Sequence, residues 1–158
     1  MILSVLFFLQ ACATVPVTGR KQLDLVPDSE LLTMSYSEYS TVMKKSKLST
    51  DQEKVDMVRR VGKRIAAAAE DFLVKEGLGS EVKNYKWEFN LIQDDKTVNA
   101  WCMPGGKVAV YTALLPITRD ETGLAVVVGH EVAHAIAKHG GERMSQGLLA
   151  QLGGVGLA

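Results

Sequence analysis

The stretch Gly129-His130-Glu131-Val132-Ala133-His134 decides how the rest of this sequence is interpreted. On an α-helix, residues four apart lie on the same face one turn from each other, so the imidazoles of His130 and His134 can bind one cation. Glu131 lies about 100° around the helix from His130, where its carboxylate can act on a bound water without being a ligand. The spacing is that of an H-E-x-x-H zinc site, with His130 and His134 as ligands and Glu131 as general base.

The residues around this stretch predict one continuous helix over about residues 119–139. Thr118-Arg119-Asp120-Glu121 has the form of a capping box with Thr118 as N-cap, and Gly140-Gly141 is a stop signal. The run Leu124-Ala125-Val126-Val127-Val128 has no polar face, which predicts that this half of the helix is buried on all sides. Burying two histidines and a glutamate without partners costs roughly 1–3 kcal/mol for each group, and a bound metal removes that cost.

The alternative interpretation of the motif is a pair of core histidines bonded to backbone carbonyls, with Glu131 in a salt bridge. The third histidine is His139, so all three histidines of the chain fall within ten residues. On a continuous helix His139 lies about 180° from His130. We therefore expect His139 to stay apart from the pair and to interact with the helix dipole near the C-terminal end.

The composition is that of a single globular domain. The chain has 158 residues, of which 47% are hydrophobic and 23% charged, and this length is sufficient to bury a core. Lys and Arg together number 18, as do Asp and Glu, so the formal net charge is zero. No overall field attracts nucleic acid, and we expect no nucleic-acid partner.

The first eleven residues resemble a secretory signal peptide. Residues 1–9 form an apolar run that is too short to span a bilayer but has the length of an h-region. The stretch Leu9-Gln10-Ala11-Cys12 resembles a bacterial lipobox, in which the cysteine becomes the lipidated first residue of the mature protein. Gln10 and the lack of a Lys or Arg before the h-region depart from that pattern. The alternative is a buried N-terminal strand.

Lipidation of Cys12 would leave Cys102, the other cysteine of the chain, without a partner. We then expect no disulfide despite an oxidising compartment, and a Cys12–Cys102 bridge is the alternative. Ala13 in place of an aspartate after the cysteine indicates sorting to the outer membrane of the bacterial cell envelope, with the protein facing the periplasm. Residues 12–27 are expected to form an extended, lipidated leader.

Hydrophobic periodicity predicts two helices, followed by a small antiparallel sheet ahead of the histidine-bearing helix. Helices are expected at residues 29–45 and 50–76, and strands at residues 85–91, 98–103 and 107–111. Thr50 has the position of an N-cap for the second helix. Asn99 and Ala100 lie where an edge strand could bind an extended peptide through its backbone, so we assign them to substrate binding.

Four stretches carry a resemblance to a known family: residues 16–23, 99–106, 129–134 and 139–144. They resemble the zinc metallopeptidases of family M48, the Oma-type and CAAX-prenyl-protease-like group, and especially its bacterial lipoprotein members. The resemblance implies a zincin-like α+β fold, with residues 28–158 as the N-terminal part of the metallopeptidase domain. It also implies one catalytic Zn²⁺ per chain, held by His130 and His134, and endopeptidase activity on cell-envelope proteins in quality control.

The resemblance further implies a third zinc ligand, a glutamate on a later helix within a Glu-x-x-x-Asp motif. No such motif occurs between His134 and Ala158, and Glu142 is not expected to replace it, so we expect a C-terminally truncated chain. Two alternatives to an active peptidase stay open. One is a non-catalytic assembly or chaperone-like factor of the envelope, against which an intact Glu131 argues, because metal binding alone needs no base. The other is an inactive fragment that lacks the third ligand.

Overall fold

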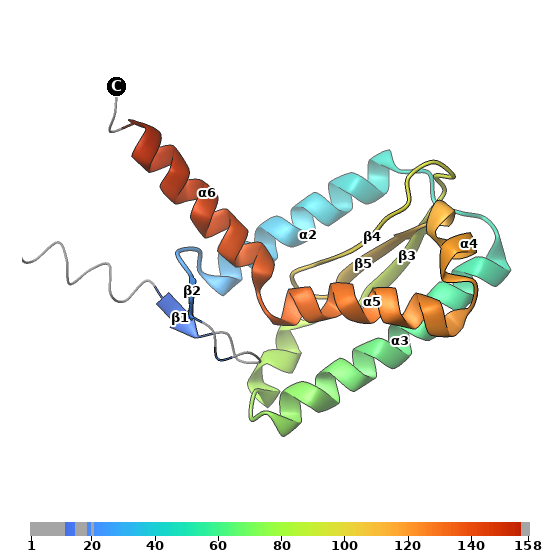
Figure 1. Cartoon of the computed structure of the whole chain (residues 1–158), viewed down its shortest axis with the longest axis horizontal. Coiled ribbons are helices and arrows are strands. Elements are labelled where there is room, and N and C mark those ends of the chain that lie inside the picture. Colours follow the sequence, from blue (N-terminus) through green and yellow to red (C-terminus); the bar gives the residue numbers. More distant parts are fainter. Residues whose placement is uncertain (1–11, 15–18, 20, 156–158) are drawn as a thin grey trace, which may run out of the picture.

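The structure, a computed structural model, describes residues 12–14, 19 and 21–155 (Figure 1). In chain order its elements are β1 (Cys12–Thr14), β2 (Lys21–Leu23), α2 (Asp28–Lys45), α3 (Gln52–Lys75), the 3₁₀ helix η1 (Gly79–Asn84), β3 (Glu88–Ile92), β4 (Ala100–Met103), β5 (Lys107–Tyr111), the 3₁₀ helix η2 (Thr112–Leu114), α4 (Leu115–Thr118), α5 (Glu121–Ile136) and α6 (His139–Val155). This arrangement of helices around a small sheet confirms the predicted α+β class.

The central sheet has three strands in the order β3-β5-β4. Strands β4 and β5 form the predicted hairpin, in which Met103 pairs with Lys107 across the Pro104-Gly105-Gly106 turn. Strand β3 runs parallel to β5, with Phe89 opposite Val108, so the prediction of a purely antiparallel sheet is wrong. The loop after β3 reverses the chain and carries it to the far edge of the sheet. The returning strand β5 then enters between β3 and β4.

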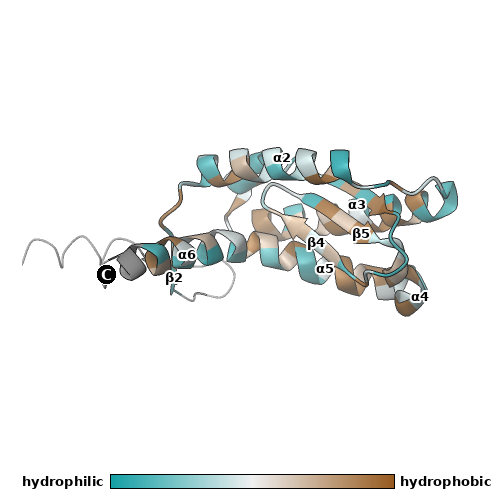
Figure 2. Ribbon diagram, turned by 90° about the horizontal axis from the view of Figure 1, so that it is seen from above, coloured by the Kyte–Doolittle hydropathy of each residue, from teal (hydrophilic) through white to brown (hydrophobic). Residues whose placement is uncertain are grey.

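The sheet lies between α2 on one face and the pair α3 and α5 on the other (Figure 2). The core occupies the α3 and α5 side. Its most deeply buried residues include Val61 of α3, Val108 and Val110 of β5, and Leu124 and Val128 of α5, each no more than 2% exposed. Because α5 packs on both α3 and β4, the helix that bears the histidine motif has a fixed position against the edge strand.

The opposite face of the sheet is covered by aromatic side chains of α2. Tyr39 meets Trp101 edge-on, with 5.9 Å between ring centroids. The Tyr39 hydroxyl also accepts a hydrogen bond from Asn90 Nδ2 at 2.7 Å. Lys107 is buried on this side, where its Nζ lies 5.1 Å from the ring centroid of Tyr36 and forms an ion pair with Glu88. The sheet is thus held from both faces.

The helix α5 begins later than expected, and the predicted cap at Thr118 is wrong. Thr118 instead ends the short helix α4, and its hydroxyl donates to the carbonyl of Leu115 at 3.0 Å. The N-cap of α5 is Asp120, whose Oδ1 accepts from the backbone N–H of Gly123 at 2.8 Å. At α3, Asp51 likewise takes the cap position expected for Thr50. Aspartate is at least as good an N-cap as threonine, so sequence alone does not separate the two.

The expected single helix over residues 119–139 is also wrong, because the chain breaks after Ile136. Lys138 adopts a left-handed backbone conformation with φ 55°, and α6 starts at His139 in a new direction (Figure 1). The Gly140-Gly141 pair, expected to stop the helix, lies inside the first turn of α6. The break therefore comes before the glycines and not at them.

The N-terminal part of the chain shows one local pairing. Strands β1 and β2, both within the expected leader of residues 12–27, pair antiparallel, with Cys12 opposite Leu23. The backbone N–H of Leu25 donates to Ser145 Oγ of α6 at 2.9 Å, which ties the end of this segment to α6. The predicted signal peptide, residues 1–11, lies outside the described residues, as does the side chain of Cys12.

None of the helices that the structure describes has the length and apolar character needed to span a bilayer.

Candidate metal centre and active site

The two histidines of the motif direct the same ring nitrogen toward each other. The Nε2 atoms of His130 and His134 are 3.0 Å apart. Two nitrogens that each lie about 2.0–2.1 Å from a tetrahedral zinc are ~3.3–3.4 Å apart, so the observed spacing differs by only a few tenths of an ångström. His130 is exposed and His134 is half-buried. The pair is therefore open to solvent on one side and anchored to the domain on the other.

The exposed side of α5 carries His130 and, one turn before it, an apolar side chain. Val126, one turn earlier, is 70% exposed, while Leu124 and Val128 are fully buried. The prediction that the run of residues 124–128 is buried on all sides is therefore wrong. Leu124 and Val128 belong to the core against which α5 packs, whereas Val126 and His130 lie on its exposed side.

Glu131 lies on the side of α5 that approaches β4. Burial, and secondly the nearby charge of Glu131, raise the pKa of the Cys102 thiol to about 12. At neutral pH that thiol is protonated, and a protonated thiol is neither a nucleophile nor a metal ligand. Cys102 therefore serves as an uncharged, mostly buried neighbour of Glu131 in this structure.

The residues present fit part of a zinc site. Zinc in proteins takes three or four ligands, and imidazole nitrogen is among its preferred donors. His130 and His134 supply two such donors at a suitable spacing. Within the described part of the chain, no three His, Cys, Asp or Glu side chains are grouped so that they could hold a metal ion together. Glu142 belongs to no such group in that part of the chain.

The third histidine is not where the sequence placed it. His139 Nδ1 lies 2.7 Å from His134 Nδ1, and the two ring centroids are 4.9 Å apart. The expectation that His139 stays apart from the pair is wrong because it assumed a continuous helix. The left-handed turn at Lys138 brings the first residue of α6 back against the last turn of α5.

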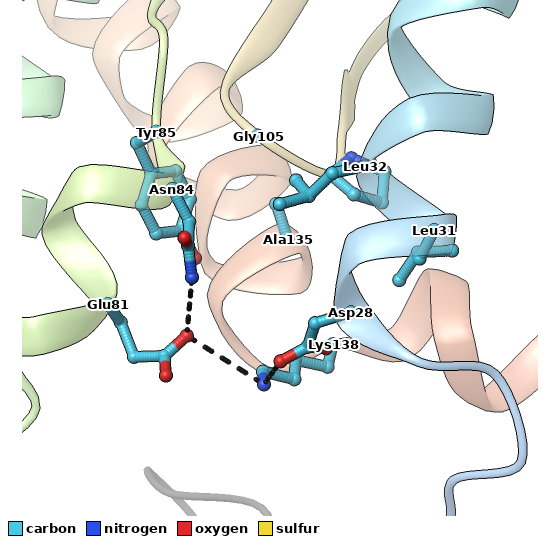
Figure 3. A pocket seen from close by; sticks show the side chains of 10 residues that line it. Asp28, Leu31, Leu32, Glu81, Asn84, Tyr85, Gly105, Ala135 and Lys138 are labelled. Carbon is cyan, nitrogen blue, oxygen red and sulfur yellow. Dashed lines mark hydrogen bonds and ion pairs between the residues drawn. The ribbon is translucent and has the colours of Figure 1, made fainter.

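Figure 3 shows the contacts that hold this turn. Lys138 Nζ lies 2.6 Å from Asp28 Oδ2 at the start of α2 and 3.8 Å from Glu81 Oε2 of η1. Asn84 Nδ2 donates to the same Glu81 oxygen at 3.2 Å. Partial burial is the largest single influence and lowers the pKa of Lys138. The hydrogen bond to Asp28, together with the negative charges of Asp28, Glu81 and Asp24, outweighs it, so the net pKa shift is upward and the side chain stays charged. These contacts offset the left-handed conformation, which costs a non-glycine residue roughly 1–2 kcal/mol.

The predicted peptide-binding edge is an edge strand of the sheet. Strand β4 pairs only with β5 among the described strands, and the N–H of Tyr111 donates to the Asn99 carbonyl at 3.1 Å. Backbone groups of an antiparallel strand point alternately toward and away from the partner. The N–H and C=O groups of Ala100 and Cys102 therefore face away from β5, toward the open side of the edge.

A pocket of about 290 Å³ connects this edge to the histidine site. It is bordered by His134 of α5, by Trp101 and Met103 of β4, and by Arg143 of α6. Its other lining residues are Val42, Cys102, Pro104, Tyr111, Ala135 and Gly140. The walls are mainly apolar. The one guanidinium group among the lining residues is that of Arg143, which is exposed.

A helix bearing H-E-x-x-H, packed beside the edge strand of a small mixed sheet, defines the class as an α+β metallopeptidase domain. The chain belongs to peptidase family M48, whose sequence profile matches residues 56–158. This confirms the resemblance to family M48 and the zincin-like α+β fold that it implied.

Individual relatives agree with this assignment. The chain is 34% identical over 134 residues to the mitochondrial metalloendopeptidase OMA1 of Schizosaccharomyces pombe. This match covers 83% of this chain and 36% of that protein. It is 27% identical over 147 residues to the mitochondrial metalloendopeptidase OMA1 of Bos taurus, covering 91% of this chain and 27% of the relative. It is also 36% identical over 72 residues to the beta-barrel assembly-enhancing protease of Yersinia pestis. This match covers 45% of this chain and 15% of that protein. The chain thus spans about a third or less of the length of these relatives.

Proposed function

We propose that the protein to which this chain belongs is a zinc-dependent metalloendopeptidase that cleaves proteins of the bacterial cell envelope in quality control. The observation that carries the proposal is the 3.0 Å approach of His130 Nε2 to His134 Nε2 on a helix packed beside an open edge strand. Membership of family M48 and the names of the metalloendopeptidase relatives support it.

In this proposal His130 and His134 hold one Zn²⁺ through Nε2. Zinc held there would supply a Lewis acid for polarising the scissile carbonyl. Glu131 takes a proton from the attacking water and later delivers it to the leaving amine, which is general acid–base catalysis by one carboxylate. The proximity of Glu131 to Cys102 of β4, the strand proposed to bind the peptide, supports this role.

We propose that the substrate binds as an extended strand along β4. The outward backbone groups of Ala100 and Cys102 would pair with the peptide, and Asn99, which is exposed, would contact it at the start of the strand. A peptide on this edge passes the pocket of about 290 Å³ beside His134, which has the volume and the apolar walls for one large apolar side chain.

One experiment tests both the metal and the edge strand in the full-length protein. Hydrolysis of an extended peptide is expected to stop when a chelator removes zinc and to return when zinc is added. Peptide derivatives carrying one N-methyl group at successive positions should show KM values that rise at every second position, because alternate N–H groups pair with a strand edge. Turnover that persists without metal would contradict the enzymatic proposal. A KM pattern without alternation would contradict the edge-strand proposal alone.

We also propose that the mature protein begins at Cys12 and is attached to the outer membrane by a lipid on that residue, facing the periplasm. The lipobox-like stretch of residues 9–12 supports this, and one relative is named a beta-barrel assembly-enhancing protease. Mass spectrometry of the N-terminal peptide from a membrane fraction is expected to find a lipid-modified Cys12. An unmodified Met1, or a disulfide between Cys12 and Cys102, would contradict the proposal.

A further inference from the structure

We propose that His139 is a positioning residue for His134. Its Nδ1 accepts a hydrogen bond from the Nδ1–H of His134 and thereby keeps the Nε2 of His134 unprotonated and directed at the metal position. The inference rests on the proposed function, because it concerns a nitrogen that is assigned there to zinc.

The chemistry of the two rings decides which is the donor. Two imidazole nitrogens 2.7 Å apart form a hydrogen bond only if one carries a proton and the other a lone pair. The Nε2 of His134 faces His130 Nε2 at 3.0 Å and must offer a lone pair to bind zinc. In a neutral ring the proton of His134 is then on Nδ1. His134 is therefore the donor, and His139 Nδ1 is the acceptor.

The fold fixes His139 in the acceptor position. Lys138, the residue before it, is held by Asp28 at 2.6 Å. The next two residues are glycines that lie close to neighbouring elements. A Cβ on Gly140 would be 3.5 Å from Pro104 Cγ in the hairpin turn, and a Cβ on Gly141 would be 3.2 Å from Leu31 Cδ2 of α2. The first turn of α6 is therefore seated against α2 and the β4–β5 turn, with His139 directed back at α5.

A partner of this kind has a measurable consequence. Zinc-binding histidines generally donate their second ring N–H to a neighbouring group, and loss of that group weakens metal affinity by about 10–100-fold. Most such partners are carboxylates or backbone carbonyls, whereas here the partner is an imidazole nitrogen. His139 need not touch zinc or substrate to have this effect, so it is not a catalytic residue.

The test compares two variants of the full-length protein. His139→Phe keeps a ring of similar size but removes the acceptor, and His139→Asn keeps an acceptor oxygen at about the place of Nδ1. Competition with a chromogenic chelator is expected to show zinc binding about 10–100-fold weaker in the Phe variant, with most of the affinity restored in the Asn variant. The melting temperature of the zinc-free protein reports any general loss of stability.

A second readout does not depend on zinc. In the zinc-free protein, ¹⁵N NMR of the imidazoles at a pH about two units above the usual histidine pKa is expected to show His134 protonated on Nδ1, and this preference should be lost in the Phe variant. Zinc affinity in the Phe variant within twofold of the wild type, or an Asn variant as weak as the Phe variant, would overturn the proposal. So would a wild-type His134 protonated on Nε2, even if the Phe variant fails to fold.

The same titrations separate this inference from the proposed function. If His134→Ala binds zinc as tightly as the wild type, the histidine pair is not the metal site and the proposed function fails. If His134→Ala loses zinc and His139→Phe does not, only the role of His139 is contradicted.

Discussion

Replacing Glu131 by glutamine is expected to lower kcat for peptide hydrolysis by the full-length protein about 10²–10⁴-fold, with little change in zinc content. The size follows from the contribution of a well-placed general acid–base group. Glutamine has nearly the same shape but cannot take a proton at neutral pH. Zinc content should persist because Glu131 projects from the flank of the His130 and His134 pair and is not one of its ligands in our proposal. Steady-state kinetics and metal analysis of the same preparation measure both quantities.

A matched control is available on the same helix. Glu121 lies in the first turn of α5, where it forms an exposed ion pair with Arg60 at 2.6 Å. Exposed pairs contribute at most about 1 kcal/mol to stability, so Glu121→Gln should leave kcat unchanged. Full activity in Glu131→Gln would rule out its role as general base. Loss of zinc in that variant would instead make Glu131 a ligand or a support for one.

Replacing Gly62 by alanine is expected to destabilise this domain by about 1–3 kcal/mol, the usual range for overpacking a core. A Cβ at this position would lie 2.2 Å from Cδ1 of Phe89, where α3 crosses β3. The Phe89 ring is buried and stacks on the Trp87 ring, with 6.2 Å between the ring centroids, so it has little room to move. Thermal unfolding of the chain should show a melting temperature lower by about 2–4 °C for each kcal/mol lost.

A glycine-to-alanine substitution at Gly147 should not destabilise the domain and could stabilise it. A Cβ on Gly147 in α6 would meet nothing within 4 Å, and alanine is favoured over glycine in a helix by up to about 1 kcal/mol. Gly147→Ala should therefore leave the melting temperature unchanged or raise it. Equal destabilisation by both substitutions would show that the close approach at Gly62 is not the cause.

Local patterns in the sequence predicted the elements that depend on local interactions. The H-E-x-x-H spacing predicted two histidines on one helix face, and the Pro104-Gly105-Gly106 turn predicted the β4–β5 hairpin, which the structure confirms. The N-caps were misplaced by one residue at Asp51 and two at Asp120, because threonine and aspartate satisfy the same helix N–H groups.

Features that depend on distant residues could not be predicted in this way. The insertion of β5 parallel to β3 follows from the path of the whole segment between them and not from any local period. The break at Lys138 is held by Asp28, which is 110 residues away in the sequence. Gly140-Gly141 was a visible signal near the break but was interpreted as the stop itself. The approach of His139 to His134 depends on that break, so sequence reasoning missed it.

The central claim, that His130 and His134 hold a catalytic zinc, is tested most directly by anomalous diffraction from crystals of the full-length protein grown with zinc. We predict one anomalous peak at about 2.0–2.1 Å from the Nε2 atoms of both His130 and His134. The absence of a peak between these two nitrogens at full zinc loading, or a zinc held entirely by other residues, would contradict the claim.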